Sequence, residues 1–128
     1  MELPATMPLS NRSADPWNTV RELTAALPGV EESRSRGMPT LKVGVKLFAR
    51  LHEDGESAVV RIDKRHRVAL IRENAEAFHV SDHYSAFPYV LVRIQKASFE
   101  ELRYVLENAW RLVAPEELVE AFDLSSAG

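Results

Sequence analysis

Residues Ser33 to Ile62 alternate apolar and polar side chains with a period of two, and this pattern constrains the fold more than any other feature of the chain. Gly44 and Gly55 interrupt the alternation and predict turns. Because successive side chains of a strand point to opposite faces, the stretch predicts a meander of three or four strands. Two further alternating segments, Phe78 to Val80 and Tyr89 to Ile94, predict two more strands.

Apolar residues at helical spacing flank both groups of strands. Asp15 and Pro16 predict the start of a first helix, since Asp accepts hydrogen bonds from unpaired amides and Pro fits the first turn. A Ser-x-x-Glu capping box at Ser98 precedes a long apolar helix face, and shorter helices are predicted over residues 63–74 and 115–122. The expected fold is α+β, a two-layer, mostly antiparallel β-sheet with helices packed on one face, in the order α-β(3-4)-α-β(2)-α.

The length of 128 residues fits one domain, which we expect over residues 15–124 between a flexible lead-in at 1–14 and a frayed tail at 125–128. The chain has no cysteine, which excludes disulfides and thiolate chemistry. It also lacks a signal-like start and any run of about 18 apolar residues. A cytoplasmic location without a membrane partner is therefore expected.

Charge is distributed unevenly along the chain, although the net charge is only −3. The segment from Ser33 to Lys96 carries 12 basic and 7 acidic residues, whereas the segments before and after it are acidic. Since steering depends on local fields as well as on the total charge, an anionic partner remains compatible with this composition.

Sorting each predicted strand by parity separates two sets of side chains. The wholly apolar set is expected to face the helices and comprises Leu41, Val43, Leu47, Ala49, Leu51, Ala58, Val60, Ile62, Phe78, Val80, Val90, Val92 and Ile94. The other set mixes cations with aromatic rings, and its candidate site residues are Lys42, Lys46, Phe48, Arg50, Arg61, Tyr89 and Arg93. This second face suits an anion or nucleic acid, a protein partner, or plain solvation with Lys and Arg stems covering apolar strand surface.

Other polar clusters give weaker signals for chemistry. His79, Asp82 and His83 offer metal-ligand atoms, but an extended strand would keep the two histidines about 13 Å apart. The residue types of a hydrolase triad occur at Asp82, His83 and Ser85. A triad requires the three side chains to meet in space, and their closeness in sequence does not indicate this. No glycine-rich phosphate loop is present. We therefore expect no enzymatic activity, no cofactor and no metal.

The basic run Lys64–Arg67 falls at the start of the predicted helix over 63–74. Its position is unfavourable for the helix dipole, which prefers anions there. Its side chains are therefore expected either to extend into solvent or to serve a ligand.

Five phrases in this order resemble the MmcQ/YjbR family over roughly residues 17–122. The resemblance rests on residues 27–32, 46–51, 78–84, 89–93 and 109–115, which read LPGVEE, KLFARL, FHVSDHY, YVLVR and AWRLVAP. It implies a two-layer domain of the secretion-chaperone-like or bacterial frataxin-like fold group. Members of the family often bear the label "DNA-binding", but the resemblance supplies no reaction or catalytic residue.

These observations together favour a non-enzymatic binding domain whose partner is nucleic acid, bound weakly and without sequence preference through the cationic and aromatic sheet face. The alternative is a protein-interaction or chaperone-like module, with a homodimer as one form of it, that uses Phe48, Tyr89 and Leu91 as anchors. A third reading places a small-molecule or metal site near His79, Asp82 and His83.

Overall fold

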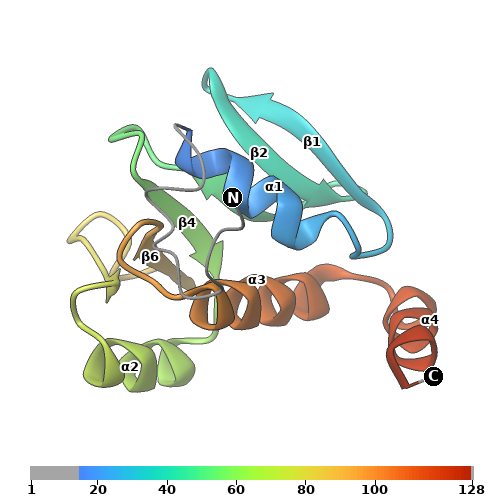
Figure 1. Ribbon diagram of the computed structural model, residues 1–128. Coiled ribbons are helices and arrows are strands. Elements are labelled where there is room, and N and C mark those ends of the chain that lie inside the picture. Colours follow the sequence, from blue (N-terminus) through green and yellow to red (C-terminus); the bar gives the residue numbers. More distant parts are fainter. Residues whose placement is uncertain (1–14, 128) are drawn as a thin grey trace, which may run out of the picture.

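The computed structural model describes residues 15–127, which form an open six-stranded antiparallel sheet with four helices packed against it (Figure 1). The sheet order is β1-β2-β3-β4-β6-β5, so the predicted meander is confirmed as four consecutive strands. The predicted lead-in over residues 1–14 lies outside the described residues. The strands are β1 (Val30–Ser35), β2 (Met38–Val43), β3 (Lys46–Leu51), β4 (Ser57–Arg61), β5 (Phe78–His79) and β6 (Tyr89–Arg93).

Each of the first three helices begins at the cap that the sequence predicts. Asp15 accepts the Trp17 amide at 3.0 Å, Asp63 accepts the His66 amide at 3.0 Å, and Ser98 closes the capping box. None of the helices within residues 15–127 has the length and apolar character needed to cross a membrane. The helices are α1 (Pro16–Thr24), α2 (Lys64–Glu73), α3 (Phe99–Val113) and α4 (Glu116–Ala127), the last longer than predicted.

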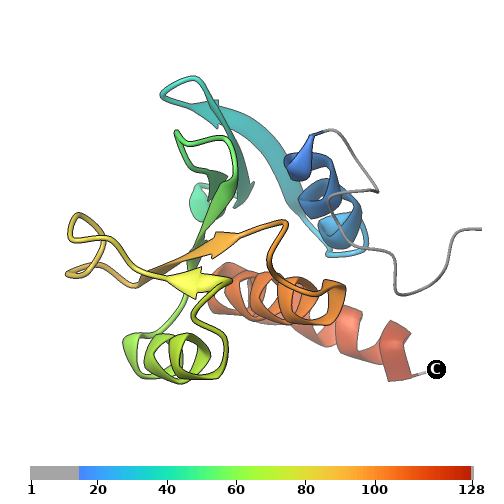
Figure 2. The same ribbon diagram turned by 60° about the vertical axis from the view of Figure 1, so that its left-hand side comes forward.

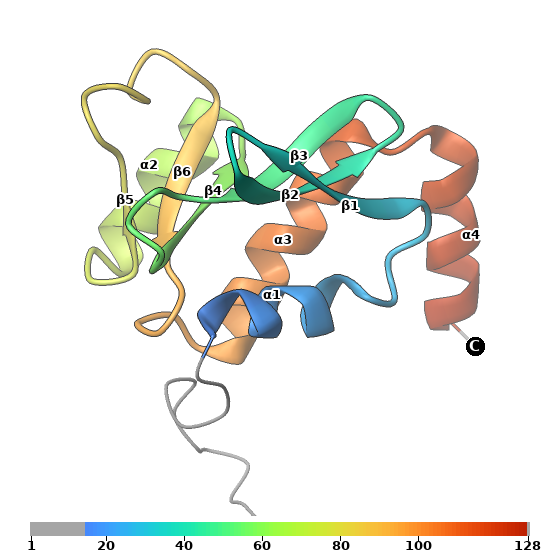
Figure 3. The ribbon, with the colours of Figure 1, turned by 90° about the horizontal axis from the view of Figure 1, so that it is seen from above.

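One face of the sheet, called the inner face, packs against α3, and α1 packs beside α3 in the same core (Figure 3). Trp110 of α3 is 0% exposed, and its Nε1 donates to the Pro28 carbonyl at 2.9 Å. The Phe122 ring of α4 lies 5.2 Å from the Trp110 ring, so α4 extends this core beyond the edge strand β1. The prediction that helices pack on one face of an antiparallel sheet is therefore confirmed.

The helix α2 lies beside α3 beneath β5 and β6 (Figures 1 and 2). His66 Nε2 is 3.1 Å from the Tyr104 hydroxyl, and the Asn74 amide donates to the Glu101 carboxylate of α3. The loop of residues 80–88 between β5 and β6 extends away from α3 (Figure 2). This loop is named the 80–88 loop below.

A β-bulge in β3 changes which side chains reach the inner face. Leu41 pairs with Ala49, but the next residue, Lys42, pairs with Leu47, which leaves Phe48 as the extra residue. Phe48 is consequently 0% exposed in the core, while Leu47 turns to the opposite, outer face. The predictions that Phe48 lies on the cationic face and Leu47 on the helix-facing side are both wrong.

Candidate functional site

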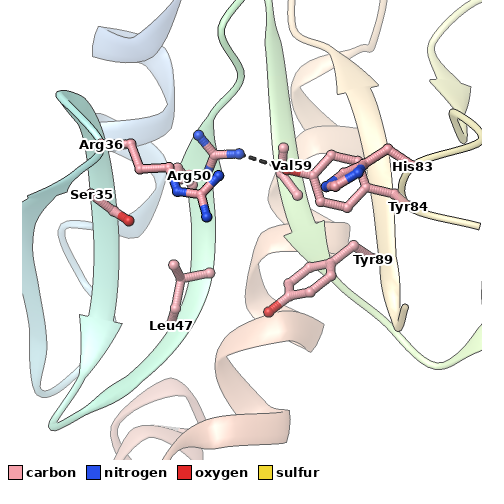
Figure 4. Close-up of a pocket in the computed structure, with 8 residues that line it drawn as sticks. All are labelled: Ser35, Arg36, Leu47, Arg50, Val59, His83, Tyr84 and Tyr89. Carbon is pink, nitrogen blue, oxygen red and sulfur yellow. Dashed lines mark hydrogen bonds between the residues drawn. The ribbon is translucent and has the colours of Figure 1, made fainter. Parts of the chain in front are cut away.

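A pocket of about 230 Å³ lies on the outer face, between the β1–β2 turn and the 80–88 loop (Figure 4). Arg36 and Arg50 line it from one side, and His83, Tyr84 and Tyr89 line it from the other. The apolar part of its lining comes from Leu47 and Val59, and Ser35 adds a hydroxyl at the edge. The pocket therefore joins cationic, aromatic and aliphatic surfaces in one place.

Cross-strand pairing places the centre of this site. Thr40, Arg50, Val59 and Leu91 are successive partners across β2, β3, β4 and β6, so their side chains form one row on the outer face. Val59 and Leu91 are each 2% exposed, which shows that this row is largely covered. The 80–88 loop accounts for much of this cover, because Tyr84 reaches from it to Arg50.

Arg50 has a mostly buried guanidinium, with 9% of the residue exposed. Its Nη1 donates to Glu53 at 3.1 Å, and its Nη2 donates to the Tyr84 hydroxyl at 2.6 Å. Burial disfavours the charged form, but these hydrogen bonds together raise the pKa of Arg50 above its ordinary value. The same contact lowers the pKa of the Glu53 carboxyl, so both partners stay ionised near neutral pH.

Arg36 enters the pocket from a strained turn. It is the first residue of the two-residue turn Arg36-Gly37, and its φ is +54°, a left-handed value that is costly for a side chain with a Cβ. Arg36 is exposed, and no ion pair holds it within residues 15–127. The Arg36 guanidinium is therefore available to a ligand at the pocket rim.

Aromatic rings form the wall opposite the arginines. The ring centres of His83 and Tyr84 are 4.7 Å apart, and those of Tyr84 and Tyr89 are 6.0 Å apart, both in edge-to-face geometry. The ring centre of His52 also lies 6.3 Å from that of Tyr84. This packing fixes ring planes beside the guanidinium groups (Figure 4).

The predicted site residues are only partly brought together. Arg50 and Tyr89 line the pocket, and register places Lys42 beside Leu47 and Arg61 beside Tyr89, on the outer face. Arg93 lies farther along the same face, where its Nη1 donates to the Glu76 carbonyl at 2.8 Å. It borders a second pocket of about 220 Å³ with His79 and Asp54.

Two of the predicted site residues do not lie on the outer face. Phe48 is buried in the core by the bulge, as described above. Lys46 pairs with Val43, a core residue, so the bulge also assigns Lys46 to the inner parity, where it stays exposed at the hairpin end. The protein-interaction alternative loses two of its anchors, because Leu91 is buried like Phe48.

The histidines of the proposed metal site point to different pockets. His83 borders the pocket with Arg50, whereas His79 borders the second pocket. Within residues 15–127, no group of three His, Asp or Glu side chains could hold a metal ion. Ser85 Oγ donates to the Asp82 carbonyl at 3.0 Å, an intraloop contact and not a triad hydrogen bond.

Sequence reasoning did not assign Arg36, His83 or Tyr84 to this site. Strand parity says nothing about residues in turns and loops, although the Arg-Gly turn and the aromatic Phe87 and Tyr84 near Pro88 mark unusual connections. As built, the site offers guanidinium forks for phosphate or carboxylate oxygens and ring faces or edges for a planar group.

Comparison with known proteins identifies the family of this chain and two partial relatives. The model of the YjbR family matches residues 25–112, which confirms the family resemblance. Uncharacterized proteins Mb2600 of Mycobacterium bovis and Rv2570 of Mycobacterium tuberculosis are each 32% identical over 75 residues, which cover 58% of this chain and 57% of the relative. The match thus spans less than two thirds of those relatives.

A solved structure has the same fold. The crystal structure of Deinococcus radiodurans protein DR2400, with family-model domain DUF419, matches with a TM-score of 0.67 over 84% of this chain and 87% of that chain. The sequence identity is 16%, so this likeness concerns the fold alone.

Proposed function

The chain belongs to the YjbR family, and we propose that it is a non-enzymatic binding domain that takes single-stranded nucleic acid on its outer sheet face. The single observation that carries this proposal is the pocket where Arg36 and Arg50 face Tyr84 and Tyr89. Guanidinium groups bind phosphate oxygens, and aromatic rings stack with bases. Both requirements of a nucleotide are met within one cavity of about 230 Å³.

Neighbouring cations extend the site along the sheet. Lys42 and Arg61 are half-exposed on the outer face, beside Leu47 and Tyr89 respectively. With Arg36 and Arg50 they provide contacts for up to about four phosphates, which limits the slope of log affinity against log salt to about −2.8 on a single strand. Affinity in the range of about 10⁻⁴ to 10⁻⁶ M at physiological salt is expected.

A single strand fits this pocket better than a duplex does. The aromatic wall and aliphatic lining of the pocket can pack against the face of a base. Such stacking stabilises binding by about 1–3 kcal/mol per base. In a duplex the base faces are occupied by their neighbours, so only the phosphate contacts would remain. Single strands should therefore bind more tightly than duplexes of the same length.

The test is fluorescence anisotropy with a labelled, mixed-sequence DNA single strand across a salt series. Arg36→Gln should lower the affinity about fivefold at 0.1 M salt and reduce the salt slope by about 0.7, the values for one lost phosphate contact. Arg36 is suited to this test because it is exposed in a turn and holds no ion pair in the described part of the chain.

Arg103→Gln is the matched control. Arg103 is an exposed cation of α3, where it borders a separate surface hollow with Tyr104. The substitution changes the net charge equally but should leave affinity and slope at wild-type values. Equal losses of affinity in both variants would mean that DNA is attracted by the overall charge and not by a site. No binding at about 20 mM salt would refute the proposal in favour of a protein partner.

A further inference from the structure

Arg67 of α2 holds the 80–88 loop and the start of β6 through their backbone carbonyls. Its Nη1 donates to Phe87 and Tyr89 at 2.9 Å each and to Tyr84 at 3.4 Å, and its Nη2 donates to Ser85 at 3.0 Å. All four acceptors fall within six consecutive residues. One side chain thereby fixes the backbone that carries the aromatic wall of the pocket.

The side chain is buried without a carboxylate partner. Arg67 is 8% exposed, and no ion pair to it occurs within residues 15–127. A buried cation is costly unless its donors are satisfied, and here carbonyl dipoles do this. The expectation that the whole run Lys64–Arg67 extends into solvent or touches a ligand is thus wrong for Arg67, whose donors face the loop.

Apart from Arg67, the loop is tied to the sheet at two points: the Tyr84 hydroxyl accepts from Arg50 at 2.6 Å, and the Pro88 carbonyl accepts from the Ile62 amide at 2.9 Å. Its internal bonds are short-range turns, such as the Tyr84 amide to the Ser81 carbonyl at 3.0 Å and the Phe87 amide to the Tyr84 carbonyl at 3.0 Å. Loops with few contacts to the rest of the fold open locally at low free energy. The Arg67 guanidinium supplies several of the contacts that tie this loop to a helix.

We infer that Arg67 is a positioning residue of the outer-face pocket: it holds the 80–88 loop so that Tyr84 stands against Arg50, ready for an anionic ligand. This inference rests on the proposed function for its ligand, but its effect on the loop does not. Because Arg67 does not line the pocket, it acts through Tyr84 and contacts no phosphate. Without the Arg67 guanidinium, the loop would be ordered only when the ligand binds. The cost of ordering it would weaken the affinity, although no contact between protein and ligand is removed.

The experiment compares Arg67→Gln and Arg67→Lys with the control Arg72→Gln. Arg72 is an exposed cation of the same helix, so its loss removes the same charge from α2 without touching the loop. Hydrogen exchange of peptides that cover residues 81–89 reports on the loop, and peptides from β3 and β4 report on the core. Anisotropy with a DNA single strand gives affinity, salt slope and the saturating stoichiometry.

In Arg67→Gln, loop exchange should accelerate about tenfold or more while β3 and β4 keep their protection. The affinity should fall by about two- to tenfold, with an unchanged salt slope and full stoichiometry. Arg67→Lys should show intermediate values, because an ammonium restores the charge and some donors but not the planar fork. If the glutamine variant fails to fold, the lysine variant alone carries both measurements.

Unchanged loop exchange in the Arg67 variants would overturn the inference, as would a faster loop with wild-type affinity. A fall in salt slope equal to that of Arg36→Gln would also overturn it, because Arg67 would then be a phosphate contact. If the wild-type protein binds no DNA, the proposed function fails. The exchange measurement still decides whether Arg67 holds the loop.

Discussion

Arg50 and Tyr84 join across the outer face by a hydrogen bond of 2.6 Å from the guanidinium Nη2 to the phenol oxygen. The two residues are separated by 34 positions in the sequence, and the bond links the central strand β3 to the 80–88 loop. Because Arg50 also donates to Glu53, one buried guanidinium fixes both the loop and the start of the β3–β4 connection. The shape of the pocket depends on this bridge.

Replacing Tyr84 by Phe should therefore lower the free energy of unfolding by about 1.5 kcal/mol, the size expected for a hydrogen bond to a charged group. Urea unfolding followed by circular dichroism measures it. The control is Tyr104→Phe, since Tyr104 is 52% exposed and its contact to His66 lies at the surface. That variant should change by less than about 0.5 kcal/mol. Equal effects of the two substitutions would contradict a structural role for the bridge.

Arg36→Asn should stabilise the fold while weakening the binding of nucleic acid. Asn tolerates a positive φ better than Arg does, and Asn-Gly is the favoured pair for such a hairpin turn, so a gain of about 0.5–1 kcal/mol is expected. The lost guanidinium should cost about fivefold in affinity for a DNA single strand at 0.1 M salt. Urea unfolding and anisotropy on the same preparation check both. A variant that is less stable and binds normally would refute the assignment of Arg36.

Much of the fold could be predicted from the sequence because its signals are local. The helix caps allow a single reading, and in β4 and β6 the predicted parity agrees with the observed register, in which Ala58 pairs with Val92 and Val60 with Val90. In β3 the pattern is ambiguous, since Leu47 and Phe48 are both apolar and either could face the core. The bulge decides which of the two faces the core. It depends on how β3 pairs with β2, and the sequence of β3 alone does not show this pairing.

The site was less predictable because much of it lies outside strands. Arg50 and Tyr89 could be found by parity, whereas Arg36 and Tyr84 occupy a turn and a loop, where parity gives no direction. Arg67 carries a signal that was available: it precedes Leu70 by three residues, which places both on one face of α2. Ile71 follows Arg67 by four residues, so this member of the basic run shares a helix face with both apolar side chains.

Gly29→Ala should destabilise the protein more than Gly44→Ala. Both glycines have a positive φ, +77° and +62°, so both substitutions carry a backbone cost of about 1 kcal/mol. Only at Gly29 would the new Cβ approach another side chain, Leu118 Cδ1 at 2.7 Å, whereas Gly44 has open space. Displacing Leu118 should raise the total to about 2 kcal/mol or more in urea unfolding. Equal losses would mean that the Leu118 side chain shifts aside without cost.

Stability should also depend on the protonation of His79. Burial of the ring, assisted by the charge of Arg93, lowers the pKa of His79 below its ordinary value of 6.5. The unfolded chain therefore binds this proton more readily, so the contribution of His79 is complete above about pH 6.5 and declines as pH falls through the folded pKa.

The measurement is the free energy of unfolding of the wild type and of His79→Gln between about pH 7.5 and pH 5. The wild type should lose stability over this interval more steeply than the variant, because glutamine does not titrate. Parallel curves would contradict the pKa shift and its cause.

The most direct test of nucleic-acid binding at the outer face is a titration of ¹⁵N-labelled protein with a short DNA single strand, followed by backbone amide shifts. The largest shifts should cluster at the pocket, on Arg36, Leu47, Arg50, Tyr84 and Tyr89, and weaken as salt is added. Amides of α1 and α4, which lie away from this face, should stay unchanged. Shifts confined to the helices, or none at protein concentrations well above about 10⁻⁴ M, would contradict the assignment.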